Sequence, residues 1–117
     1  MNLRPGEVIP IRIGFHQASG GKLRPAVVLL DSGDDDFVAA PITSRFRLSK
    51  FDLVIQEWNE AGLNTAPTIR VHKLTVLTKN EVMRRLGELT AVDRSRLAGV
   101  FRDAFSLDQE APDAAGN

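Results

Sequence analysis

The sequence contains no cysteine, and its two histidines, His16 and His72, lie far apart. Without cysteine there is no disulfide, no thiolate nucleophile and no cysteine-ligated metal. The absence of disulfides fits a reducing compartment, so we expect a cytoplasmic protein. Two distant histidines do not supply the ligand set of a zinc site. We therefore expect neither a bound metal nor any other cofactor.

The sequence also lacks a long apolar run and a charge of one sign. Its longest apolar run, Ala26 to Leu30, is far too short to cross a bilayer, and residues 1–6 show no apolar stretch typical of a secretory signal. The formal net charge is 0, with 15 basic and 15 acidic residues. Three of the acids, Asp108, Glu110 and Asp113, fall in the last ten residues, so the cations exceed the acids by three in the rest of the chain. This imbalance favours an anionic partner, bound by a local patch rather than by the whole surface.

What the sequence does contain is an ordinary globular composition. It has 117 residues, 43% hydrophobic and 26% charged, which is typical of one compact domain. We expect that domain to span residues 1–107. Residues 108–117 are acidic and lack hydrophobic periodicity, so we expect a disordered tail.

Strand patterns dominate the first ninety residues. Alternation predicts a strand from Glu7 to Gly14 with one apolar face, and Pro10 favours an edge or bulged position. Ala26 to Leu30 is apolar on both faces and predicts a central, fully buried strand. Phe37 to Ile42 completes a hairpin across the Asp31 to Asp36 turn, whose repelling carboxylates we expect to be solvated. Further strands are expected at Phe51 to Gln56, Thr68 to Leu77 and Arg84 to Leu89, with helical turns around Trp58 and from Lys79 to Val82.

A single long helix is expected from Ala91 to Leu107. Thr90 and Asp93 have the spacing of a capping box, and an apolar stripe beginning at Leu97 is expected to pack on the sheet. Short strands followed by one closing helix predict a mainly β fold, either a small barrel or a strongly bent sheet capped by the helix. Periodicity alone does not separate an SH3-like barrel from an OB-fold.

Polar residues next to the strands are the candidates for chemistry. Arg24 precedes Pro25 at the start of the buried strand, beside a glycine-containing loop, and its guanidinium suits a phosphate; the alternative is an exposed rim arginine. Thr43 and Ser44 follow the next strand, and the hairpin brings Thr43 near Arg24; the alternative is a pair of turn-forming hydroxyls. Arg70 and His72 are expected on one strand face, which by default is solvated.

Five stretches together resemble the MazF/PemK/Kid family of toxins from type II toxin–antitoxin systems. In chain order they are Gly6-Glu7-Val8, Gly21 to Leu29 around Arg24-Pro25, Ala40 to Ser44, Thr68 to Leu74, and Leu86 to Leu89 before the final helix. The resemblance covers roughly residues 5–105. It implies an SH3-like small β-barrel with a C-terminal helix, a homodimer, and a partner antitoxin.

The resemblance also implies an activity and a set of site residues. Most members are endoribonucleases that cut single-stranded RNA, and Arg24 and Thr43 match their catalytic arginine and threonine. The residues expected to hold RNA are His16, Gln17, Lys22, Ser44, Arg70 and His72. This chain departs from Kid-like members at His72, where they carry a catalytic aspartate, so an acid–base pair of that type is not expected here.

The implied chemistry needs no metal, because RNA carries its own nucleophile in the 2′-hydroxyl. Arg24 would stabilise charge on the phosphorane and Thr43 would donate a hydrogen bond to it, giving 2′,3′-cyclic phosphate and 5′-hydroxyl ends. His16, His72 or Glu7 would take the proton. Two other functions remain open: a gyrase-poisoning toxin of the same fold, against which the polar acidic tail argues, and a catalytically inactive module that binds nucleic acid or an antitoxin.

Overall fold

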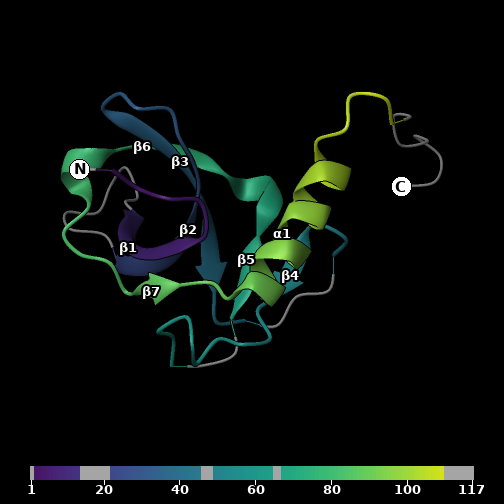
Figure 1. Cartoon of the computed structure of the whole chain (residues 1–117), viewed down its shortest axis with the longest axis horizontal. Helices are drawn as coiled ribbons and strands as arrows, with labels where there is room; N and C mark the ends of the chain where they lie inside the picture. Colours follow the sequence, from purple (N-terminus) through teal and green to yellow (C-terminus); the bar gives the residue numbers. More distant parts are fainter. Residues whose placement is uncertain (1, 14–21, 46–48, 65–66, 110–117) are drawn as a thin grey trace.

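The computed structural model describes residues 2–13, 22–45, 49–64 and 67–109, and in these ranges the protein is mainly β structure with one α-helix (Figure 1). The strands are β1 (Glu7–Ile13), β2 (Lys22–Asp31), β3 (Asp36–Thr43), β4 (Asp52–Val54), β5 (Thr68–Arg70), β6 (Thr75–Thr78) and β7 (Gly87–Glu88). Two 3-10 turns, η1 (Val71–Lys73) and η2 (Lys79–Glu81), flank β6, and α1 (Ala91–Ala104) follows β7. No helix in these ranges is long and apolar enough to cross a membrane.

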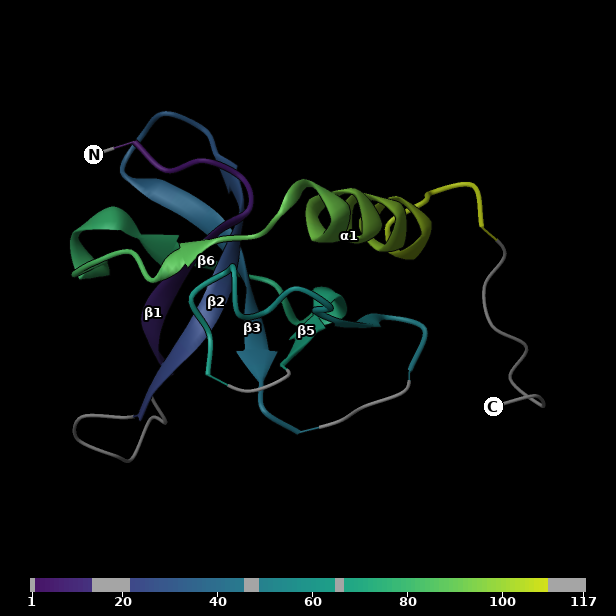
Figure 2. The ribbon, with the colours of Figure 1, turned by 60° about the horizontal axis from the view of Figure 1, so that its bottom comes forward.

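All seven strands belong to one bent sheet. Its order is β4-β5-β3-β2-β1-β7, and β6 pairs with the first half of β3 while β5 pairs with its end. The two partners of β3 diverge, so the sheet splits and curves, and α1 packs against β4 and η1 on one side (Figure 2). The predicted mainly β fold, a bent sheet with one closing helix, is confirmed.

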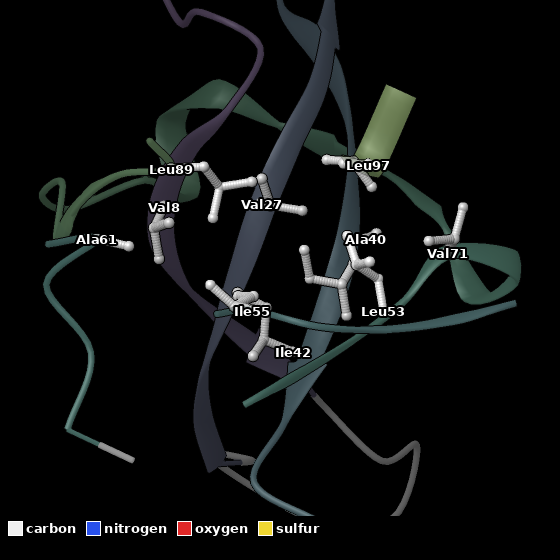
Figure 3. Packing of buried hydrophobic residues seen from close by; sticks show 11 residues of the cluster. Val8, Val27, Ala40, Ile42, Leu53, Ile55, Ala61, Val71, Leu89 and Leu97 are labelled. Carbon is white, nitrogen blue, oxygen red and sulfur yellow. The ribbon is translucent and has the colours of Figure 1, made fainter. Parts of the chain in front are cut away.

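Two hydrophobic clusters lie on opposite faces of the long strands. The first contains Val8, Val27 and Ala40, and Leu97 of α1 packs into it (Figure 3). The second contains Ile9, Ala26 and other side chains that point to the opposite face of the strands. The predicted single apolar face of β1 is therefore wrong, because both of its faces are buried. A strand enclosed on both sides loses the alternation that a half-exposed strand shows.

Two prolines face each other across β1 and β2. Pro10 and Pro25 are Cα partners in the antiparallel register. Neither has an N–H to exchange, so the pair fits only a position where the two strands make no mutual hydrogen bond. Beyond Val8 the described part of β1 has no strand on its outer side. The predicted edge position of Pro10 is confirmed, and the missing donor there discourages pairing with another chain.

The buried strand ends earlier than its sequence suggests. The β2–β3 register shifts between Val28 and Leu30, and Leu30 beyond this irregularity is 52% exposed. The prediction that the whole run from Ala26 to Leu30 is buried is therefore wrong at its last residue. An irregularity in the ladder turns the following side chain toward solvent.

The acidic turn after β2 is not fully solvated. Asp31 forms an ion pair with Lys79 at 2.8 Å and accepts a hydrogen bond from the N–H of Leu3 at 2.8 Å. These interactions, led by Lys79, lower the pKa of Asp31 to about 2. The expectation of a freely solvated carboxylate fails here because the partners come from distant parts of the chain, which fold back onto the turn.

The predicted strand from Thr68 to Leu77 is interrupted. β5 ends at Arg70, η1 occupies Val71–Lys73, and β6 begins at Thr75. Val71 is buried against the first cluster. Because of this break, β5 pairs with the end of β3 and β6 pairs with its beginning. A continuous strand could not pair with both. The strands predicted at Phe51 to Gln56 and Arg84 to Leu89 are likewise shorter, as β4 and β7.

The start of α1 differs from a capping box. Thr90 caps the helix by accepting the Asp93 N–H at 3.4 Å, as expected. The Asp93 carboxylate, however, accepts hydrogen bonds from the backbone of Gln56 at 3.1 Å and Glu57 at 2.7 Å. Asp93 is fully buried and therefore ties the helix to the loop after β4. The helix ends at Ala104, three residues before the expected Leu107.

Candidate functional site

Arg24 lies near the beginning of β2, where its Cα faces Ile11 of β1. It is partly buried, and among the described residues it has no hydrogen-bond or ion-pair partner. A guanidinium held in a strand without a carboxylate retains its full capacity to bind an anion. The structure therefore favours a ligand-binding role over that of a structural arginine.

Thr43 is the last residue of β3. The β2–β3 register ends where Ala26 faces Pro41, two residues from Arg24 on one strand and two residues from Thr43 on the other. The hairpin therefore brings the segments that carry Arg24 and Thr43 to the same end of the sheet. The Thr43 hydroxyl accepts the N–H of Arg45 at 3.1 Å. That bond fixes the hydroxyl oxygen and leaves its proton available to a ligand.

The neighbouring strand β5 continues the same face. Thr68 faces Thr43, and Ile69 faces the buried Ile42. Because side chains alternate, Arg70 projects on the side of Thr43 rather than into the first cluster. Arg70 forms an ion pair with Asp52 through its Nε at 3.2 Å. Burial acts to raise the pKa of Asp52, but hydrogen bonds from Ser49 and Arg70 outweigh it and hold that pKa below its ordinary value.

His72 is not a neighbour of Arg70 on a strand face, and that prediction is wrong. It lies in η1, with its ring centroid 5.2 Å from that of Phe51. Its Nδ1 is buried and has no partner among the described residues. Burial, together with Arg70 and Lys73, lowers the pKa of His72. The imidazole is therefore neutral at pH 7.

A pocket of about 380 Å³ opens beside Arg24 at the end of the sheet. Its apolar walls are Leu23, Pro25, Ile42, Leu63, Pro67 and Leu86, and its polar lining is Arg24, Ser44, Asn64 and Arg84, with Gly62 completing the wall. Ser44, predicted from the sequence, lines the pocket, whereas Thr43 does not. No acidic residue lines it among the described residues. No local sequence pattern indicates Arg84 or Asn64, since the segments that carry them meet only in the folded chain.

Glu7, considered for proton transfer, lies elsewhere. It stands four residues along β1 from Ile11, roughly 13 Å from the level of Arg24. Its carboxylate pairs with Arg85 at 2.6 Å and accepts the N–H of Arg4 at 2.6 Å. Glu7 is therefore a structural ion-pair partner and takes no part in chemistry at Arg24.

The family follows from comparison with known proteins. A model of PemK-like, MazF-like toxins of type II toxin–antitoxin systems matches residues 4–105. The chain belongs to this family. No curated protein matches it.

Solved structures share the toxin's fold at low sequence identity. An endoribonuclease in complex with its cognate antitoxin, from a mycobacterial species, is 17% identical, with 93% of this chain and 100% of that chain covered and a TM-score of 0.75. The Mycobacterium tuberculosis toxin MazF-mt6 is 22% identical, with 91% and 100% covered and a TM-score of 0.72. A MazE–MazF complex from Deinococcus radiodurans is 17% identical, with 89% and 95% covered and a TM-score of 0.69. The expected MazF-like fold is thereby confirmed.

Three predicted RNA contacts remain. Two of them, His16 and Gln17, fall outside the described residues. Lys22 is the first residue of β2 and faces Ile13 of β1. No group of three or more histidine or acidic side chains that would hold a metal occurs in the described ranges.

Proposed function

We propose that this toxin is an endoribonuclease that cuts single-stranded RNA without a cofactor, leaving 2′,3′-cyclic phosphate and 5′-hydroxyl ends. The observation that carries the proposal is Arg24, which has no partner among the described residues and lines a pocket that no described acid lines. Cleavage of RNA by its own 2′-hydroxyl requires from a protein, beyond proton transfer, a cation and a hydrogen-bond donor at the phosphate; we assign these roles to Arg24 and Thr43.

In the reaction the 2′-hydroxyl gives up its proton to a base or to water, and its oxygen attacks the adjacent phosphorus. The bond from phosphorus to the 5′-oxygen of the next nucleotide breaks, and that oxygen takes up a proton to become the 5′-hydroxyl. Charge builds on the non-bridging oxygens of the phosphorane. In this proposal Arg24 binds those oxygens through two parallel N–H groups. Thr43 donates its hydroxyl proton to the same centre, since its oxygen is already fixed by the Arg45 N–H. Arg70, held by Asp52, binds a neighbouring phosphate.

The experiment is cleavage of single-stranded RNA by purified protein in excess EDTA. Arg24→Ala should slow cleavage roughly a hundred- to thousand-fold, the usual cost of losing one charge-stabilising donor. Its Tm should be nearly unchanged, because Arg24 supports no described contact. Thr43→Ala should slow cleavage less, since a neutral hydroxyl is a weaker donor. Arg102→Ala, at an exposed arginine of α1, is the matched control and should cut at the wild-type rate.

Two outcomes would contradict the proposal. Wild-type cleavage by Arg24→Ala would remove Arg24 from the active site. Absence of cleavage, with gyrase trapped on DNA, would identify a gyrase poison.

We also propose a cytoplasmic homodimer neutralised by an antitoxin that covers Arg24. Two of the structures that share this fold are complexes of a toxin with its antitoxin. An antitoxin segment that folds on contact can cover such a site. Expression of the chain alone should arrest bacterial growth, and co-expression of its antitoxin should relieve the arrest. Unimpaired growth with soluble protein present would count against the toxin.

A further inference from the structure

Two adjacent arginines before β7 have different surroundings. Arg85 pairs with Glu7 at 2.6 Å and donates to the carbonyl of Asn2, so its guanidinium is used within the fold. Arg84 is exposed, lines the pocket beside Arg24, and has no partner among the described residues. The fold therefore uses one of the two cations structurally and leaves the other at the pocket.

The wall that carries Arg84 is held by a close backbone approach. A Cβ on Gly62 would lie 2.3 Å from the carbonyl oxygen of Leu86, and one on Gly87 would lie 2.2 Å from that of Ala61. Only glycine permits these contacts, so the loop after β4 is locked against the segment before β7. Leu86 also donates its N–H to Val8 at 2.7 Å. We call this close backbone contact, at Gly62 and Gly87, the lock. It holds the segments that carry Asn64 and Arg84 together, so both residues line the same pocket.

The chemistry of the pocket matches one nucleotide. Its apolar walls offer a base an apolar contact surface, and the base gains by leaving water. An amide such as that of Asn64 carries both a donor and an acceptor and reads a base edge. A guanidinium binds a phosphate. Arg24 and Arg84 both line this pocket, so successive phosphates of one strand can meet successive cations.

We infer that this pocket is a nucleotide subsite next to the scissile phosphate, in which Arg84 binds a flanking phosphate and Asn64 reads the base. The inference rests on the proposed function for its substrate class, single-stranded RNA. Arg84 acts on binding and Arg24 on the chemical step. Loss of Arg84 should therefore raise Kd and KM while leaving the cleavage rate at saturating RNA unchanged.

The test is binding to random-sequence single-stranded oligonucleotides with 2′-O-methyl riboses, which have no nucleophile and cannot be cut. Arg84→Ala should weaken binding roughly ten- to hundred-fold, the cost of one charge-assisted contact. The slope of log K against log salt should fall by about 0.7, the value for one phosphate on a single strand. Arg84→Lys should restore the salt slope. Arg102→Ala on α1 is the matched control and should change neither quantity.

Base reading is tested with the four 2′-O-methyl homopolymers. Arg84→Ala should weaken all four alike, because a phosphate contact carries no sequence information. Asn64→Ala should change their relative affinities. Equal loss for all four with Asn64→Ala would overturn the base-reading role.

The outcomes separate this inference from the proposed function. Cleavage by the wild type, with unchanged affinity and salt slope in Arg84→Ala, would overturn the subsite and leave the endoribonuclease standing. Binding that depends on Arg84, without any cleavage of ordinary RNA, would support the subsite and overturn the nuclease. Absence of binding by the wild type would overturn both.

Discussion

Replacing Asp93 by alanine should destabilise the protein more than any surface substitution on α1. The carboxylate is fully buried and accepts three hydrogen bonds: 3.1 Å from the Gln56 N–H, 2.7 Å from the Glu57 N–H and 2.7 Å from the guanidinium of Arg96. Each bond to a charged group contributes about 1.5–3 kcal/mol, and these contributions are not additive. Removal of one partner from a buried charged cluster costs about 3–5 kcal/mol. We expect that loss in the free energy of unfolding.

Urea denaturation followed by circular dichroism measures the effect. The midpoint should fall while the m-value stays constant, because the surface exposed on unfolding is nearly the same. The Tm should fall by on the order of 10–20 °C, at roughly 4 °C per kcal/mol for a domain of this size. Asp103→Ala is the matched control: it removes an exposed aspartate from the same helix and should change stability by less than about 0.5 kcal/mol. A loss under about 1 kcal/mol in Asp93→Ala would refute the reasoning.

Three further predictions concern the backbone contact at Gly62, the pH dependence of stability and the homodimer. Gly62→Ala should cost roughly 1–3 kcal/mol more than Gly33→Ala, because both glycines have positive φ but only at Gly62 would the added methyl meet a backbone oxygen; equal midpoints in urea would refute the lock. His72 has a lowered folded pKa, so the unfolded state binds more protons than the folded state as the pH falls below about 6.5, and stability should fall there; His72→Phe should flatten that part of the Tm–pH curve, and an unchanged curve would contradict the assignment. Val76 is 63% exposed and faces Val38, which in turn faces the exposed Leu30. We expect this apolar surface to lie in the homodimer interface, so Val76→Asp should yield monomers by light scattering. A wild type that is already monomeric would disprove the dimer.

Sequence patterns predicted the parts of the fold that depend on local order. Alternation and apolar runs located β1, β2 and β3, and the Thr90 cap located the start of α1. The same information predicts that the segments carrying Arg24 and Thr43 lie at one end of the hairpin, since a hairpin fixes which residues face each other. That Arg24 and Thr43 act together on a ligand stays a prediction.

The rest depended on contacts between distant segments. Thr68 to Leu77 has the composition of one strand, but β3 takes β5 at its end and β6 at its beginning, and η1 must join them. The partners of Asp31 include Lys79, which lies 48 positions away, and no local pattern signals that pairing. Arg84 was missed for the same reason, because its pocket exists only when the loop around Gly62 meets Leu86.

A net charge of zero does not prevent the toxin from presenting a cationic site. Among the described residues, at least five arginines are held by acids: Arg4, Arg70, Arg85, Arg94 and Arg96 pair with Glu88, Asp52, Glu7, Glu88 and Asp93, respectively. Those acids are neutralised away from the pocket beside Arg24, which no described acid lines. Charge counted over the whole chain therefore underestimates the local field. RNA affinity should follow the few unpaired arginines at this pocket, and the salt dependence of binding counts them directly.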